Sequence, residues 1–311
     1  MISKWMFFAI ASLCFCIQVV SGQESSNSSP ETHPLPETVA KNAKLQEEYA
    51  AKAFFEGPVW DPAGKKLYFT SFVDKDTKIL RLEGGGKASV WLDETKGING
   101  TYLSLKGRML GAQAFGQHVM SYGFGENGPT DTIIVAQNPK WNQPNDVCQT
   151  PNGNIYFTDP DFKNRKTSAV YLKTTNGAIK KIITDMPLPN GVIASNDGKT
   201  LYVGDSHEKL WRSFPIKADG TVGTGKVFFD PKTKRQDSPD GMSIDAKGNL
   251  YLSGRGGVWV ASSTGQALGL ISVPEFCSNV TFGGADGKTL YFTCSNKVYS
   301  LKMNVKGAQF P

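Results

Sequence analysis

The segments DPAGKKLYFTS (61–71) and GADGKTLYFTCS (284–295) share one pattern, a turn containing Gly followed by a hydrophobic strand. Four further copies lie between them: LSLKGRMLGAQ (103–113), TPNGNIYFTDP (150–160), SNDGKTLYVGDS (195–206) and DAKGNLYLSG (245–254). The spacings are 43, 46, 45, 50 and 39 residues between the repeat glycines Gly64, Gly107, Gly153, Gly198, Gly248 and Gly287. A period of about 45 residues in Gly-punctuated, strand-rich units is typical of β-propellers. The repeat predicts an all-β fold, a six-bladed β-propeller with four-stranded antiparallel blades around a central channel.

The last repeat is one strand short. It offers strands at 290–294 and 297–303 before the chain reaches Pro311, whereas the first repeat offers four, at 57–60, 67–71, 79–82 and 89–92. The segment LQEEYAAKA (45–53) is the available donor of the missing strand, although it also suits a short helix. Pairing of this segment with the last repeat would close the ring and remove a free sheet edge.

The N-terminal region differs from the repeats in composition. Lys4, the apolar run 5–20 and the small residues at 21–22 predict a secretory signal peptide over 1–22, and therefore a secreted, periplasmic or cell-surface protein. A retained membrane anchor is the alternative, and no later stretch is apolar enough to span a bilayer. Residues 23–42 are rich in Ser, Pro, Glu and Thr, which predicts a disordered tether and leaves 43–311 as the propeller domain.

Charge and cysteine content argue against a nucleic-acid-binding protein and against a disulfide-rich scaffold. The net charge is +6 over 311 residues, without a block of five Lys or Arg, so we expect no nucleic-acid partner. The three cysteines after residue 22 are too few for a disulfide scaffold. Because Cys277 and Cys294 flank a predicted hairpin, we hypothesise a disulfide between them. We expect a monomer that acts on a small-molecule substrate.

A polar residue stands eight positions before every repeat glycine: Glu56, Asn99, Asn145, Asn190, Asp240 and Asn279. Each opens the predicted first strand of its blade, which lines the channel of a propeller, so the six should form one ring that faces the axis. Asn and Asp also cap turns, but six matches at one offset exceed what turn capping explains. Two buried carboxylates are costly without a counter-charge. Oxygen donors of this kind favour Ca²⁺, or Mg²⁺ or Mn²⁺, over Zn²⁺.

The two carboxylates are the strongest candidate ligands of this metal, and two amide oxygens complete a partly open shell. The predicted metal ligands are therefore Glu56, Asp240, Asn145 and Asn190, and the ring members left for substrate or for bound water are Asn99 and Asn279. An open coordination position is typical of a catalytic metal. The segment GDSHE (204–208) lacks the G-x-S-x-G context of a nucleophile elbow, so we expect no serine nucleophile.

Several of these segments together resemble the senescence-marker-protein/gluconolactonase (regucalcin-like) family. They are EGPVW, PNDV followed by GNIYFTDP, LPNGV followed by GKTLYV, PDGMSID and NVTFGG, and the resemblance runs over 54–301. It implies a six-bladed propeller with one divalent metal, usually Ca²⁺ or Zn²⁺, that hydrolyses sugar lactones. It also implies that Glu56, Asn145, Asn190 and Asp240 hold the metal. An Arg that grips the sugar in that family is replaced here by Gln143, so the substrate shell differs.

The predicted ring is compatible with three functions. The leading one is a metal-dependent lactone hydrolase, in which the ion polarises the carbonyl and Asp240 takes a proton from the attacking water. A phosphotriesterase or another esterase on the same site is the first alternative. A calcium-stabilised extracellular binding module without turnover is the second, since a fold alone does not fix a function.

Overall fold

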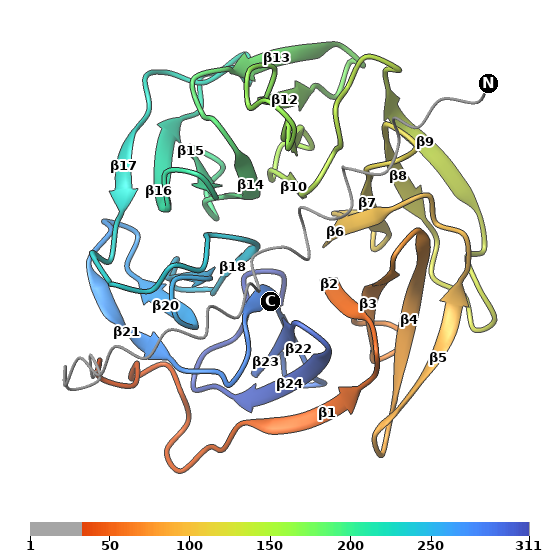
Figure 1. Ribbon diagram of the computed structural model, residues 1–311, viewed down its shortest axis with the longest axis vertical. Coiled ribbons are helices and arrows are strands. Elements are labelled where there is room, and N and C mark those ends of the chain that lie inside the picture. Colours follow the sequence, from red (N-terminus) through yellow and green to blue (C-terminus); the bar gives the residue numbers. More distant parts are fainter. Residues whose placement is uncertain (1–32, 311) are drawn as a thin grey trace, which may run out of the picture.

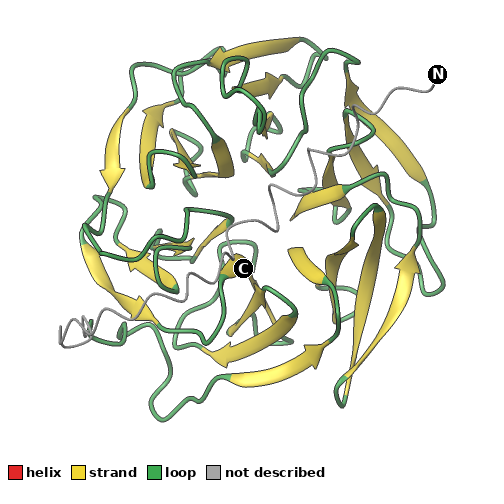
Figure 2. Ribbon diagram, viewed as in Figure 1, coloured by secondary structure: helices red, strands yellow, loops and turns green. Residues whose placement is uncertain are grey.

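Six four-stranded antiparallel sheets surround a central channel in the computed structural model, which describes residues 33–310 (Figure 1). The regular elements in these residues are strands, joined by loops and turns (Figure 2). The structure therefore confirms the six-bladed β-propeller. Between residues 33 and 310 there is no helix long and apolar enough to cross a membrane. The predicted signal peptide and residues 23–32 of the predicted tether lie outside the described residues.

In each of the first three blades the strands follow one another from the channel outwards. Blade 1 consists of β2 (Phe54–Asp61), β3 (Lys66–Val73), β4 (Asp76–Gly84) and β5 (Lys87–Leu92). Blade 2 consists of β6 (Ile98–Leu103), β7 (Met109–Gln113), β8 (His118–Tyr122) and β9 (Thr132–Gln137). Blade 3 consists of β10 (Val147–Gln149), β11 (Ile155–Asp159), β12 (Ala169–Lys173) and β13 (Ile179–Ile183).

The next two blades repeat this order, and the last one combines both ends of the propeller domain. Blade 4 consists of β14 (Pro189–Ala194), β15 (Thr200–Asp205), β16 (Leu210–Pro215) and β17 (Lys226–Phe229). Blade 5 consists of β18 (Met242–Ile244), β19 (Leu250–Ser253), β20 (Val258–Ala261) and β21 (Ala267–Ile271). Blade 6 consists of β22 (Cys277–Gly283), β23 (Thr289–Cys294), β24 (Lys297–Lys302) and β1 (Gln46–Ala50).

Strand β1 completes blade 6, as the short last repeat required. It pairs antiparallel with β24, with Gln46 opposite Ser300 and Ala50 opposite Lys297. The segment is thus a strand and not a helix, because pairing supplies its backbone groups with partners and buries the edge of β24. The ring is closed by a contact between the first and last parts of the domain.

The described end of the predicted tether packs on the propeller. Val39 is 5% exposed and forms a β-bridge with Met303. The backbone N–H of Leu270 donates to the carbonyl of Pro34 at 3.0 Å. Residues 33–42 therefore lie against blades 5 and 6 instead of extending away from them, because Val39 supplies an apolar side chain that the Ser- and Pro-rich composition concealed.

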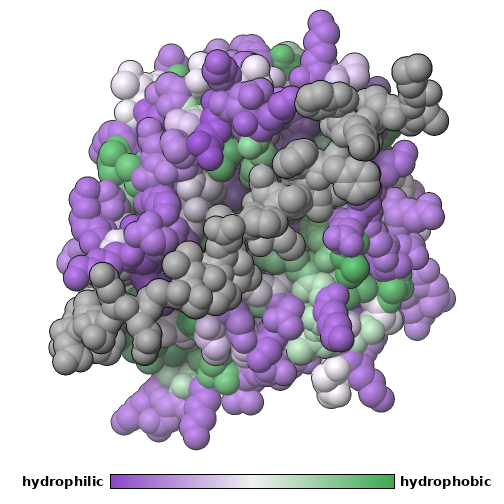
Figure 3. Space-filling model, in the orientation of Figure 1, coloured by the Kyte–Doolittle hydropathy of each residue, from purple (hydrophilic) through white to green (hydrophobic). Residues whose placement is uncertain are grey.

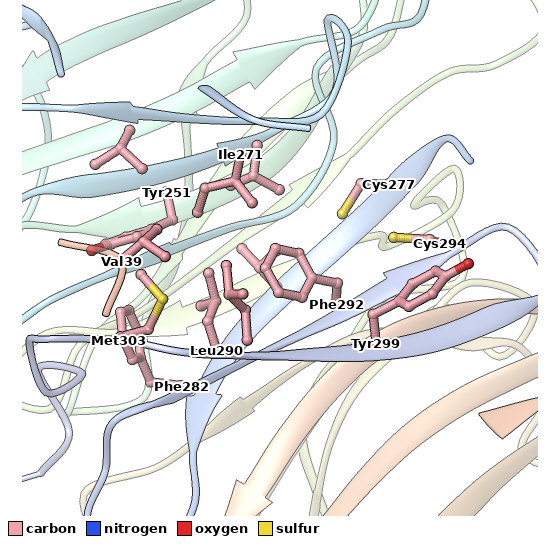
Figure 4. Close-up of a cluster of buried hydrophobic side chains, with 14 of the residues drawn as sticks. Val39, Tyr251, Ile271, Cys277, Phe282, Leu290, Phe292, Cys294, Tyr299 and Met303 are labelled. Atoms are coloured by element: carbon pink, nitrogen blue, oxygen red, sulfur yellow. The ribbon is translucent and has the colours of Figure 1, made fainter. Parts of the chain in front are cut away.

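The hydrophobic core consists of six clusters, each between two neighbouring blades. The cluster between blades 5 and 6 joins Tyr251 to Phe282 and Phe292, and Val39 closes one end of it (Figure 4). Burial of each such aromatic side chain contributes about 1.5–3 kcal/mol. On the face shown in Figure 3, hydrophilic side chains predominate around the rim of the propeller. The blades are thus held by side-chain packing between sheets, while hydrogen bonds hold each sheet internally.

The repeat glycines serve the turn between the first and second strands. Five of the six have positive φ, between 66° at Gly107 and 89° at Gly153. In blade 1 the positive φ moves to Lys65 (53°), the residue after Gly64. Glycine adopts this conformation without the steric cost that a Cβ brings, which explains the periodic signal in the sequence.

Candidate functional site

The six predicted ring residues occupy equivalent positions at the beginning of the innermost strands. Four lie inside those strands, whereas Asn145 and Asp240 come shortly before β10 and β18. Glu56 is opposite Thr70 of β3, and the backbone N–H of Asn145 donates to the carbonyl of Thr158 at 2.9 Å. The repeat therefore places all six at one level of the channel. Five of them are at most 9% exposed, and Asp240 is partly exposed.

Glycines next to the ring residues allow the innermost strands to approach one another. A Cβ on Gly191 would lie 2.1 Å from the carbonyl oxygen of Asp240, and one on Gly241 would lie 2.0 Å from Cγ of Asn279. The backbone N–H of Gly100 donates to the carbonyl of Asn145 at 2.7 Å, between blades 2 and 3. Small residues at these points bring side chains from separate blades within contact distance.

Two carboxyl groups meet in the channel. Glu56 is 3% exposed, and its Oε2 accepts hydrogen bonds from Nδ2 of Asn279 at 3.0 Å and from the backbone N–H of Gly57. Burial raises the pKa of Glu56, which these hydrogen bonds and one with Asp240 oppose. Burial, followed by the charge of Glu56, raises the pKa of Asp240 well above its ordinary value. The pair therefore cannot carry two negative charges at low cost without a counter-charge.

A third carboxyl group, that of Asp146, lies beside this pair. It is 5% exposed, and it accepts from the backbone N–H groups of Val147 at 2.9 Å and of Val192 at 3.3 Å. Burial, followed by the charge of Glu56, raises its pKa well above the ordinary value. The sequence reasoning missed this residue, although it directly follows the ring member Asn145. Asp146 adds negative potential to the site and ties blade 3 to blade 4.

The ring amides differ in how their atoms are used. Asn279 is fully engaged, since its Oδ1 accepts from the N–H of Val280 at 2.8 Å while its Nδ2 donates to Glu56. This geometry makes Asn279 a support for Glu56, and its predicted substrate contact stays a prediction. By contrast, Oδ1 of Asn99 and Oδ1 of Asn190 are buried without a hydrogen-bond partner among the described residues.

This donor set fits a hard divalent cation. The carboxyl pair needs a counter-charge, and the buried amide oxygen of Asn190 beside Asp240 has no donor, so a hard cation would suit both groups. The part of the chain described here contains no group of three or more His, Cys, Asp or Glu that could hold a metal. Between residues 33 and 310, no hydrogen bond joins the side chain of Asn99 or of Asn145 to the carboxyl pair.

The Asp159 carboxylate holds the segment that carries Gln143 through hydrogen bonds. Oδ2 of Asp159 accepts from the backbone N–H of Asn142 at 3.0 Å and from its Nδ2 at 3.2 Å. Burial raises the pKa of Asp159 to about 6. Trp141 is 3% exposed and packs against Phe157, with 4.8 Å between ring centroids. Gln143 itself is partly exposed, so the segment presents it on a rigid support.

The predicted cysteine pair lies next to a ring member, because Cys277 is two residues before Asn279. Cys277 and Cys294 are cross-strand partners in β22 and β23, and both are buried (Figure 4). The structure thus confirms their proximity, but both thiols are free, as is that of Cys148. Burial and the neighbouring thiol raise the pKa of Cys277 well above its ordinary value, which leaves it a poor nucleophile.

The channel continues past the ring as a cavity of about 630 Å³. Its wall includes Asn279 and Asp146 at the level of the ring, together with apolar residues further along the innermost strands, such as Val59, Val192 and Met242. The ring is therefore connected to an open volume on this side and is not sealed in the core.

The propeller domain is similar in sequence to known proteins. A family model described as "SMP-30/Gluconolactonase/LRE-like region" matches residues 54–296. The gluconolactonase of Zymomonas mobilis is 27% identical, covering 81% of this chain and 79% of that protein. The pentonolactonase XacC of Haloferax volcanii is 26% identical, covering 76% and 80%. Regucalcin of Bos taurus is 24% identical, covering 77% and 82%.

Solved structures share the fold. A gluconolactonase from Xanthomonas campestris superimposes with a TM-score of 0.74 at 24% identity, covering 90% of this chain and 99% of that one. A calcium-binding regucalcin from Agrobacterium tumefaciens superimposes with a TM-score of 0.67 at 21% identity, covering 84% and 96%. At these identities the likeness shows the propeller architecture alone.

Proposed function

The chain belongs to the SMP-30/gluconolactonase/LRE-like family, and we propose that it hydrolyses sugar lactones at the channel ring, with a divalent cation as cofactor and Asp240 as general base. Two curated relatives, a gluconolactonase and a pentonolactonase, support a lactone hydrolase. The observation that carries the site assignment is the carboxyl pair, with Glu56 buried and Asp240 partly exposed, beside the unpartnered amide oxygen of Asn190.

The cation is held by oxygen atoms in this proposal. Glu56, Asn145, Asn190 and Asp240 are the ligands, and Ca²⁺ is the expected ion because the donors are hard oxygens and relatives include a calcium-binding regucalcin. Mg²⁺, Mn²⁺ and Zn²⁺ are the other candidates to test. When bound, such an ion supplies Lewis-acid polarisation of the lactone carbonyl.

Asp240 is the carboxylate suited to proton transfer. It is partly exposed to the channel, whereas Glu56 is buried and engaged by Asn279 and Gly57. Asp240 removes a proton from a water molecule while the water oxygen attacks the carbonyl carbon. The bond between the carbonyl carbon and the ring oxygen then breaks, and the ring oxygen takes up a proton. The product is the open-chain hydroxy acid, so atoms and charge balance without a further reactant.

Gln143 distinguishes the substrate shell from that of the regucalcin-like relatives. A glutamine offers one amide donor group and one acceptor oxygen to sugar hydroxyls, where an Arg would offer only charged donors. Because Asp159 holds the preceding residue through two hydrogen bonds, Gln143 meets the substrate from a fixed backbone. This favours neutral sugar lactones as substrates.

Acid release from two lactones tests the proposal. Purified protein is assayed with D-glucono-1,5-lactone and with a pentonolactone, each with Ca²⁺, Mn²⁺, Zn²⁺ or excess chelator. We expect turnover that requires both a cation and an intact Asp240. A folded, cation-binding protein that turns over neither lactone would contradict the proposal and favour a phosphotriester, another ester or a binding role.

We further propose that the protein acts outside the cytoplasm, because residues 1–22 have the composition of a secretory signal peptide. Expression in a secreting host followed by N-terminal sequencing should give a mature chain that begins at Gln23. A chain that retains Met1 and stays in the cell would contradict this assignment.

A further inference from the structure

The hydroxyl group of Ser206 lies between two ring members. Its Oγ accepts a hydrogen bond from Nδ2 of Asn190 at 3.1 Å and donates to the carbonyl oxygen of Pro239 at 2.6 Å. Ser206 is the first residue after strand β15, and Pro239 directly precedes Asp240. One side chain therefore connects the Asn190 amide to the backbone that carries the Asp240 carboxylate.

The direction of these hydrogen bonds fixes the orientation of the Asn190 amide. A hydroxyl has one proton, and a prolyl carbonyl can only accept, so the Ser206 proton goes to Pro239. The remaining lone pairs of Ser206 can only accept, which requires the NH₂ end of Asn190 to face it.

The other end of the amide is then left without a partner. Asn190 is 9% exposed, and its Oδ1 is buried with no hydrogen-bond donor among the described residues. A flipped amide would set Oδ1 against the Ser206 oxygen, whose proton already goes to Pro239, and would turn NH₂ toward the channel, where it cannot bind a cation. We propose that Ser206 is a positioning residue, which holds the Asn190 carbonyl oxygen toward the cation in the channel. This inference rests on the metal-dependent function proposed above.

Blade 6 offers a matched control. Ser295 is the first residue after β23 and so corresponds to Ser206 after β15. Between residues 33 and 310, its Oγ donates to the carbonyl of Phe276 at 3.4 Å and hydrogen-bonds to no ring side chain. Ser295→Ala therefore removes a hydroxyl at the same place in the repeat without touching a ligand.

Calorimetric titration of chelator-treated protein with Ca²⁺ tests the inference without any activity assay. We expect Ser206→Ala to weaken Ca²⁺ binding by about 10- to 100-fold, the usual effect of losing a partner that orients a metal ligand. Ser206→Thr, which keeps the hydroxyl, and Ser295→Ala should stay within about threefold of the unmodified protein. Melting temperatures of the metal-free proteins show whether each variant is folded.

A double-mutant cycle separates positioning from general structural support. If Ser206 acts through Asn190, then Ser206→Ala should weaken Ca²⁺ binding little further in an Asn190→Ala background. Additive losses, or unchanged affinity in the Ser206→Ala single variant, would overturn the inference while leaving the metal site intact. Absence of Ca²⁺, Mn²⁺ and Zn²⁺ binding by the unmodified protein would overturn the proposed metal dependence, and this inference with it.

Discussion

Asn190 in blade 4 and Asn279 in blade 6 stand at the same position of the repeat, yet their surroundings differ. Both ends of the Asn279 amide have protein partners, one of them the Glu56 carboxyl. Asn190 donates from one end to Ser206 and leaves its oxygen unpartnered. The repeat thus determines where a side chain lies, while its hydrogen-bond partners determine which of its atoms stay available to a ligand.

Loss of the general base should have the largest effect. Asp240→Asn removes the group that accepts the proton from water, so lactone turnover at saturating Ca²⁺ should fall by about 10²- to 10⁴-fold. Because the side chain is also a proposed ligand, Ca²⁺ affinity is measured by calorimetry in parallel. Turnover near that of the unmodified protein at saturating Ca²⁺ would exclude Asp240 as the base.

Removal of the cation should destabilise the ring. If Ca²⁺ is present at 100 times its dissociation constant, chelation should lower the free energy of unfolding by about 2.7 kcal/mol. The pKa values of Glu56 and Asp240 are raised in the metal-free fold, so this fold binds more protons than the unfolded chain. Its stability therefore falls as pH rises above the unfolded carboxyl pKa of about 4.

The measurement is thermal unfolding with Ca²⁺ and with chelator at several pH values. We expect the difference in melting temperature between the two conditions to grow from acidic to neutral pH. A difference that is constant or shrinks with pH would show that the cation does not neutralise this carboxyl pair.

Alanine substitutions of Asn190 and Asn279 should distinguish a residue that binds the cation from one that supports Glu56. Asn190→Ala removes the free oxygen and should weaken Ca²⁺ binding by about 10- to 100-fold. Asn279→Ala leaves Glu56 and the N–H of Val280 short of a partner and should cost about 1–3 kcal/mol of stability, with a smaller loss of Ca²⁺ affinity. Titration calorimetry and urea unfolding measure both quantities, and the reverse ranking of affinities would refute the distinction.

The smallest effect is expected at the edge of the site. Gln143→Arg introduces a charged donor at this position and should lower KM for D-glucono-1,5-lactone by about tenfold at most, roughly 1.4 kcal/mol, with kcat little changed. Gln137→Arg on the exposed outer strand β9 adds the same charge away from the ring and serves as the control. Equal effects of the two variants would assign the change to surface charge alone.

Much of the fold followed from the glycine-punctuated repeat, because turns with positive φ and hydrophobic second strands are local features. The fixed offset to the ring residues also followed, since β-strand register transmits a local spacing to the channel. The closing strand was ambiguous because QEEYA has no strong local preference, and only the unpaired edge of β24 makes it a strand.

Contacts between residues far apart in the chain could not be predicted from the sequence. The use of Asn279 by Glu56 depends on a contact between residues 223 positions apart, and the bond between Ser206 and Pro239 also crosses from one blade to the next. Asp146 was passed over because it follows a ring position where four other blades have glycine. The packing of Val39 escaped notice because one apolar residue in a polar segment carries no periodic signal.

The ring of polar side chains crosses the seam at which the propeller closes. Glu56 belongs to the first blade and Asn279 to the last, and a second bond, from Oγ of Ser278 to the carbonyl of Phe55 at 2.7 Å, spans the same seam. The proposed site is thus incomplete until the two ends of the domain have met. A cation bound there would stabilise the closed propeller relative to partly folded chains in which blade 6 has not yet packed against blade 1.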